Sequence, residues 1–194
     1  IKILRELKDQ MKNRKKLVYV AFSADLLHEG HINILKKASK YGKVLVGLLT
    51  DQAIISYRKI PHLNYKQREV ILKNIKYVKK VVEQETLDYS KNLIKYKPDY
   101  VVHGDDWKSG IQKNTRTKVI KILKKWSGKL IEIPYSHNIE PEKIKDQNLQ
   151  TGTTPDIRKS KLSRLMEAKD IVRILETHNA IGGLIIENLN LNLK

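Results

Sequence analysis

Two histidines, His28 and His31, stand three residues apart on either side of Gly30 and follow a short apolar run. That run, 17–22, is rich in β-branched and aromatic residues, which is typical of a buried strand. Apolar residues then recur at helical spacing over 32–41, so the histidines are expected where a loop becomes a helix. The first turn of a helix offers unpaired N–H groups and a partial positive charge, both of which favour a phosphate. These residue types therefore indicate phosphate chemistry.

The elements that must position the histidines follow from the same periodicities. Strands are expected at 17–22, 43–51, 77–82, 100–104 and 129–133, and helices at 32–41, 65–75, 87–96 and 111–126. This alternation predicts an α/β fold, a Rossmann-like doubly wound parallel sheet of about five strands. Ligands of such sheets bind beyond the carboxyl ends of the strands, where the histidines would lie. Neither a G-x-G-x-x-G sequence nor a P-loop lysine is present, which excludes dinucleotide dehydrogenases and P-loop NTPases.

Composition narrows the class of protein further. The 194 residues include 39 Lys+Arg against 21 Asp+Glu, a formal charge of +18 that suggests an anionic partner. The lysines look scattered along the sequence and no aromatic–basic motif accompanies them, so specific nucleic-acid binding is not expected. The lack of cysteine excludes disulfides and thiolate metal sites. No apolar run has membrane-spanning length and no signal peptide is recognisable, so a cytoplasmic protein without a membrane partner is expected.

Two motifs carry a family resemblance. The stretch 22–31, which ends in His-Glu-Gly-His, resembles the HxGH motif of the nucleotidyltransferase superfamily together with its lead-in. The stretch 103–107, His-Gly-Asp-Asp-Trp, resembles the (M/H)-G-D-D-W motif of the cytidylyltransferase branch, notably glycerol-3-phosphate cytidylyltransferases. The resemblance covers a domain at 17–149. It implies transfer of CMP from CTP to a small phosphate or phosphonate with release of pyrophosphate, Mg²⁺ as cofactor, and a homodimer.

The resemblance also assigns roles to single residues. His28 and His31 would be the catalytic donors to the α-phosphate. The nucleotide-binding residues that it implies are Phe22, Ser23, Ala24, Asp25, Gly30, His103, Asp105 and Trp107. The residues that it implies for phosphate or substrate are Arg58, Lys59, Arg68 and Asp106, with Lys43 as the weakest basic candidate. Arg68 is expected to be exposed on its helix, with a plain solvated charge as the alternative. Asp25 is the candidate Mg²⁺ ligand.

Segments on either side complete the chain. Residues 1–16 have apolar positions typical of an amphipathic N-terminal helix. Residues 150–194 are expected to form a helical C-terminal appendage, with a linker, a helix over 156–177 and a buried strand over 184–187. This tail resembles the opening of phosphoenolpyruvate mutases, in which a cytidylyltransferase-like domain can precede the mutase barrel. It implies phosphonate biosynthesis, with 2-hydroxyethylphosphonate or 2-aminoethylphosphonate as acceptor and a polyol phosphate next. A barrel needs about 250 residues, so a fragment without mutase activity is expected.

One segment departs from the cytidylyltransferase pattern. The family carries R-T-x-G-I-S-T-T-K-I where this chain has residues 135–144, and its hydroxyl residues hold the triphosphate. Here Glu140, Pro141 and Glu142 replace them, and carboxylates repel a triphosphate. A catalytically weakened nucleotide-binding domain, which assembles with a phosphoenolpyruvate mutase partner, is therefore the alternative hypothesis. A nucleic-acid-binding module is a third hypothesis that rests on charge alone.

Overall fold

The computed structural model describes residues 15–57, 60–108, 112–134, 155–172 and 174–188. The chain divides into two compact units, Ile1–Thr153 and Thr154–Lys194. The departing segment 135–144 lies outside the described residues, and so does the predicted N-terminal helix except for its last two positions.

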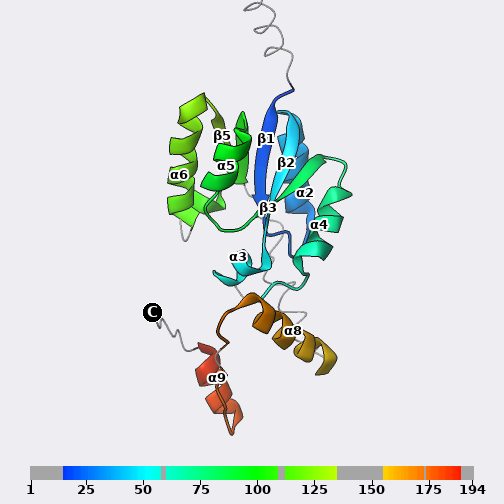
Figure 1. Ribbon diagram of the computed structural model, residues 1–194, viewed down its shortest axis with the longest axis vertical. Helices are drawn as coiled ribbons and strands as arrows, with labels where there is room; N and C mark the ends of the chain where they lie inside the picture. Colours follow the sequence, from blue (N-terminus) through cyan, green and yellow to red (C-terminus); the bar gives the residue numbers. More distant parts are fainter. Residues whose placement is uncertain (1–14, 58–59, 109–111, 135–154, 173, 189–194) are drawn as a thin grey trace, which may run out of the picture. The chain divides into compact units, whose positions relative to one another are not determined.

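A five-stranded parallel sheet forms the centre of the first unit, in the order β3-β2-β1-β4-β5 (Figure 1). The strands are β1 Leu17–Phe22, β2 Lys43–Leu49, β3 Val78–Gln84, β4 Tyr100–Gly104 and β5 Lys129–Ile133. The predicted Rossmann-like parallel sheet is confirmed. β1 lies in the middle, and the chain passes from it first to β2 on one side and later to β4 on the other.

Helices cover both faces of this sheet. The helical elements of the first unit are α2 Glu29–Ser39, α3 Asp51–Ile55, α4 Tyr65–Lys73, α5 Ser90–Tyr96, η1 Asp105–Lys108, α6 Lys113–Leu123 and η3 Lys124–Trp126. Val18 and Val20 of β1 pack in one cluster with Leu35 of α2 and Leu72 of α4. Tyr19, which points to the other face, packs with residues of α5 and α6. The alternation of side chains along β1 thus builds two cores, one on each face.

A buried polar network supports the end of β3. The Tyr19 hydroxyl and Asn92 Nδ2 both donate to Gln84 Oε1, and Gln84 Nε2 donates to the carbonyls of Thr86 and Asp88. Gly47 on β2 makes room for the phenol, because a Cβ there would lie 1.8 Å from the Tyr19 hydroxyl. Burial raises the pKa of Tyr19, so the hydroxyl stays a donor. The network fixes the loop after β3 at the carboxyl edge of the sheet.

The second unit contains the helices α8 Pro155–Ala168 and α9 Ala180–Asn188. The predicted buried strand over 184–187 is wrong, because these residues belong to α9, and Leu184 and Ile185 are 60% and 58% exposed. A short apolar run does not distinguish a strand from a helix, and a strand needs a partner to satisfy its backbone. The predicted helix over 156–177 ends at Ala168. Among the described residues, no helix is long and apolar enough to cross a membrane.

Candidate active site

The joint between β1 and α2 lies at the carboxyl edge of the sheet, where the chain order changes direction between β1 and β4. Ala24 adopts a φ of 52°, in the left-handed region, and is only 1% exposed. His28 is extended (φ −136°, ψ 174°) and is the N-cap of α2. The loop after β1 therefore turns tightly and delivers the two predicted catalytic histidines to the start of a helix, as predicted.

The two histidines form a reciprocal cap. His28 Nδ1 accepts a hydrogen bond from Gly30 N at 3.1 Å, and His31 Nδ1 accepts one from His28 N at 3.4 Å. Their ring centroids lie 4.1 Å apart. Because each Nδ1 is an acceptor, a neutral ring carries its proton on Nε2. The cap thus selects the tautomer in which both Nε2–H groups are donors.

The protonation of His28 agrees with this arrangement. Burial lowers the pKa of His28 below its ordinary value of 6.5, so the ring is neutral at neutral pH and Nδ1 keeps its role as acceptor. The edge of Phe22 packs against the His31 ring, with centroids 5.2 Å apart. Two oriented N–H donors at the positive end of a helix suit a phosphate on which negative charge builds up.

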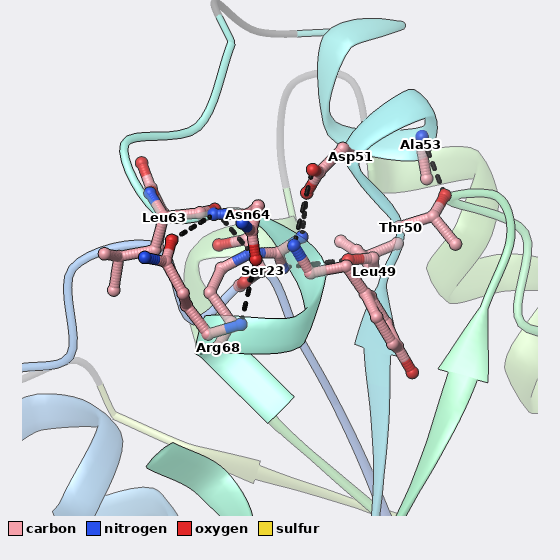
Figure 2. A network of polar contacts seen from close by, with 11 residues as sticks. Ser23, Leu49, Thr50, Asp51, Ala53, Leu63, Asn64 and Arg68 are labelled. Carbon is pink, nitrogen blue, oxygen red and sulfur yellow. Dashed lines mark hydrogen bonds and ion pairs between the residues drawn. The ribbon is translucent and has the colours of Figure 1, made fainter. Parts of the chain in front are cut away.

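Arg68 lies in a different environment from the predicted one. The prediction that Arg68 is exposed on α4 is wrong, because the side chain is fully buried (0% exposed). Nε donates to Leu63 O, Nη1 donates to Ser23 O and Leu49 O, and Nη2 pairs with Asp51 (Figure 2). Since the guanidinium is held by main-chain carbonyls and a carboxylate, it ties together the ends of β1 and β2 and the loop before α4. We therefore assign Arg68 a positioning role.

Asp25 strengthens the same junction. One carboxylate oxygen accepts from Leu63 N at 3.1 Å and the other pairs with His62 Nδ1 at 3.0 Å. Together with Arg68, these contacts fasten residues 61–64 to the loop that carries the histidines. Among the described residues, no three His, Asp or Glu side chains gather as a metal site. The Mg²⁺ role of Asp25 stays a prediction.

At the end of β4, the structure differs from what the sequence suggested for one residue, Trp107. Trp107 is 1% exposed, and its indole stacks on His103 at 3.9 Å and on Tyr89 at 6.0 Å. The ring is therefore not exposed for stacking on a nucleotide base, and the nucleotide-binding role of Trp107 stays a prediction. His103 and Asp105 remain partly exposed at the carboxyl edge. The side chain of Asp106 lies outside the described residues.

Glu132 on β5 holds Trp107 in place. It accepts from the indole Nε1 at 2.8 Å and pairs with Arg116 of α6 through both oxygens, at 2.8 and 2.9 Å. Arg116 lowers the pKa of the Glu132 carboxyl from 4.5 to about 2, and the Trp107 hydrogen bond acts in the same direction. Because the pKa is lower in the folded protein, this stabilisation is complete above pH 4.5 and is lost as the pH falls towards 2.

Replacing Glu132 by glutamine is expected to lower the free energy of unfolding by about 2 kcal/mol at neutral pH, the scale of hydrogen bonds to a charged group. The difference in free energy of unfolding between the variant and the unchanged protein should shrink as the pH falls from 4.5 towards 2. Urea unfolding at several pH values measures it. Glu85→Gln is the matched control, since the Glu85–Lys91 pair is exposed (55% and 74%) and should contribute little. A Glu132→Gln effect of equal size at neutral and acid pH would contradict the assignment.

The remaining predicted residues divide into two groups. Arg58 and Lys59 lie outside the described residues. The prediction of Lys43 as a phosphate-binding candidate is wrong, because it is the first residue of β2 and therefore about 20 Å from the carboxyl edge.

Asp51, the partner of Arg68, was not predicted. A signal was present, since Thr50 and Asp51 follow a strand in a helix-capping pattern, and Thr50 does cap α3.

A family model and several known proteins are similar to this chain in sequence. Residues 23–163 match the family model described as Cytidylyltransferase-like. The glycerol-3-phosphate cytidylyltransferase of Bacillus subtilis is 29% identical over 136 residues, which cover 69% of this chain and 96% of that protein. The ethanolamine-phosphate cytidylyltransferase of Arabidopsis thaliana is 33% identical over 103 residues, or 50% of this chain and 24% of that protein. An FAD synthase of Archaeoglobus fulgidus is 30% identical over 82 residues, 42% of this chain and 60% of that protein.

A solved structure agrees with the fold. The lipopolysaccharide core biosynthesis protein from Thermoplasma volcanium GSS1 superposes with a TM-score of 0.53 at 24% identity, over 63% of this chain and 98% of that one. This likeness supports the sheet order and the position of its carboxyl edge.

Proposed function

Since the chain belongs to the cytidylyltransferase-like family, we propose that it is a nucleotidyltransferase that transfers CMP from CTP to a small phosphate or phosphonate and releases pyrophosphate. The observation that carries the proposal is the histidine pair at the start of α2, whose mutual cap leaves two Nε2–H groups as donors. A pair of N–H donors at a helix N-terminus suits the negative charge of an α-phosphate.

The reaction needs positioning more than acid–base chemistry. An oxygen of the acceptor attacks the α-phosphorus of CTP, a new P–O bond forms, and the bond to the bridging oxygen of pyrophosphate breaks. A phosphate acceptor is largely a dianion near neutral pH, so no general base has to remove a proton. His28 and His31 donate to the non-bridging α-phosphate oxygens as charge builds up on them. Arg68 and Asp25 act at a distance, by holding the loops that place the histidines.

A divalent cation is part of the proposal. A triphosphate carries several negative charges, and Asp25, Asp51 and Asp105 stand at or near the described carboxyl edge. Asp25 is the carboxylate that would hold Mg²⁺, and the ion would supply positive charge to offset this repulsion. Arg58 and Lys59 are the proposed contacts to pyrophosphate or acceptor.

The acceptor is the finer part of the proposal. Two of the relatives named above act, by their names, on glycerol 3-phosphate and on ethanolamine phosphate. The tail sequence favours 2-hydroxyethylphosphonate or 2-aminoethylphosphonate, with the chain placed in phosphonate biosynthesis. The two groups share a small organic substituent on a tetrahedral phosphorus dianion. The alternative, a weakened nucleotide-binding domain that assembles with a phosphoenolpyruvate mutase, rests on Glu140 and Glu142 in the departing segment.

Pyrophosphate release decides between these functions. The protein is incubated with Mg²⁺, each of the four nucleoside triphosphates, and each of these four acceptors. Release with CTP and one acceptor, abolished by EDTA, is the expected result. Release only with ATP would overturn the cytidylyl assignment and favour the adenylyl chemistry that the name FAD synthase implies for that relative. Binding of CTP by calorimetry without any release would favour the assembly role.

A further inference from the structure

Lysines gather at the amino edge of the sheet, the edge opposite to the histidines. Five described segments make up this edge: 15–17, 39–43, 73–78, 96–100 and 123–129. They contain ten lysines, all exposed: Lys15, Lys16, Lys40, Lys43, Lys73, Lys76, Lys97, Lys124, Lys125 and Lys129. Asp99 is the single acidic residue in these segments, and it accepts a hydrogen bond from Leu17 N at 2.7 Å. The sequence impression of scattered lysines is therefore wrong, because the parallel topology collects them.

The opposite edge has the reverse charge. In the described segments 22–29, 49–51, 84–90 and 104–108, six acidic residues with described side chains accompany one lysine: Asp25, Glu29, Asp51, Glu85, Asp88 and Asp105, with Lys108. The start of β1 and the end of α6 lie at the lysine-rich end of the sheet (Figure 1). The first unit thus has a basic face and, away from it, an acidic face that bears the histidines.

Helix dipoles account for only a small part of this separation. α2, α4, α5 and the α6–η3 helix all end at the amino edge, because each leads into the next parallel strand. Each helix end carries about half a negative charge, so the four together carry about two. The net positive charge of ten lysines and one aspartate is several times larger than the negative charge of the four helix ends. Within the described residues, Lys73 pairs with Glu69 at 2.9 Å, and no other lysine of the face forms an ion pair.

Aromatic side chains lie between the lysines. Tyr41 is 43% exposed, and its ring packs against Tyr100 at 5.4 Å. Lys16 Nζ lies 5.2 Å from the Tyr100 ring centre, and Lys76 Nζ lies 5.2 Å from that of Tyr77. These rings are half-buried with polar ends, a combination that is enriched at membrane–water interfaces. Lys16 and Lys76 each lie over one face of a ring, which leaves less ring surface for stacking nucleic-acid bases.

We propose that this basic face binds the surface of an anionic phospholipid bilayer. Five strand starts in a row make a face about 19 Å wide, which suits an extended planar partner. The basic residues of its five segments are all lysine, whereas arginine is the residue that recognises nucleic-acid phosphates and bases with fixed geometry. Lysines on flexible stems interact with a diffuse layer of headgroup charge. In this orientation the histidines face away from the membrane, so the active site stays open to solvent.

The test compares two triple variants of the full chain with equal net charge. Lys40→Glu/Lys43→Glu/Lys125→Glu reverses three charges on the basic face. The control, Lys66→Glu/Lys91→Glu/Lys113→Glu, reverses three exposed lysines in the first turns of α4, α5 and α6, at the opposite edge of the sheet. Binding to vesicles of about 30% phosphatidylglycerol in phosphatidylcholine is measured by co-sedimentation at about physiological salt. Circular dichroism establishes that both variants are folded.

The unchanged protein and the control are expected to bind the anionic vesicles within about threefold of each other, and pure phosphatidylcholine vesicles not at all. The face variant is expected to bind about 100-fold more weakly, from about tenfold per one or two lysines near an anionic surface. Equal weakening of both variants would show that net charge alone decides, and would overturn the proposal. So would absence of vesicle binding, or binding to duplex RNA in its place at the same salt.

Discussion

Alanine at both His28 and His31 is expected to lower the rate of nucleotidyl transfer by about 10⁴-fold, because each N–H donor aimed at developing charge contributes about 10²–10³-fold. The two effects need not add, since the rings act on the same phosphate and each caps the other. The fold should survive, because loss of a helix cap costs about 1 kcal/mol against a total of about 5–15 kcal/mol. Steady-state pyrophosphate release measures the rate.

A second variant separates the donor from the cap. His28→Asn keeps an acceptor for Gly30 N, since asparagine is a favoured N-cap residue, but it lacks the Nε2–H donor. It should unfold at the urea concentration of the unchanged protein and still lose about 10²-fold or more in rate. His178→Ala, an exposed histidine of the second unit, is the matched control and should change neither. Full activity of His28→Asn would show that the cap, and not the donor, is what the reaction needs.

Replacing Arg68 by methionine is expected to cost about 3–5 kcal/mol of stability, the range for breaking a buried ion pair on one side. Methionine keeps much of the volume but leaves three carbonyl groups and the Asp51 carboxylate, 26% exposed, without their donor. Lys73→Met breaks the i,i+4 pair with Glu69 on the same helix and should cost at most about 0.5 kcal/mol. Urea unfolding followed by circular dichroism measures both.

Activity adds a second readout for Arg68. Below its unfolding transition, the Arg68→Met protein should show a lower kcat, because the carbonyl of Ser23 belongs to the loop that delivers the histidines. Its KM for CTP should change little, since the buried guanidinium is not expected to touch the nucleotide. A large rise in KM with unchanged kcat would contradict the positioning role and restore the predicted contact with phosphate.

The strands and the position of the histidines could be predicted from local pattern. β1, β4 and β5 begin and end at the predicted residues, because each is a short, mostly apolar run next to charged or turn-forming residues. These are Lys16 before β1, Asp99 and Asp105 around β4, and Gly128 and Pro134 around β5. His28 and His31 lie at a helix start for the same reason, since glycine, loop residues and helical periodicity adjoin in sequence.

The partners of the buried polar residues could not be predicted in this way. Arg68 is buried because the ends of β1 and β2 and the loop before α4 supply carbonyls to it, from up to 45 residues away. Trp107 is buried because Glu132, 25 residues later, accepts from its indole. Neither neighbour is visible in a local window. The prediction of a strand for the apolar run in α9 failed for another reason, since the composition of that run fits a helix as well as a strand.

The mutual cap of the histidines has a consequence for how such sequences change over time. A lineage that no longer needs the reaction would still lose stability by replacing either ring with a side chain that offers no acceptor, because each Nδ1 satisfies a main-chain amide at the start of α2. Selection for folding alone can therefore slow the loss of the His-x-Gly-His signature after turnover has ceased. Two histidines at these positions in a relative therefore indicate that the helix start is intact. Only a rate measurement shows that the relative is an enzyme.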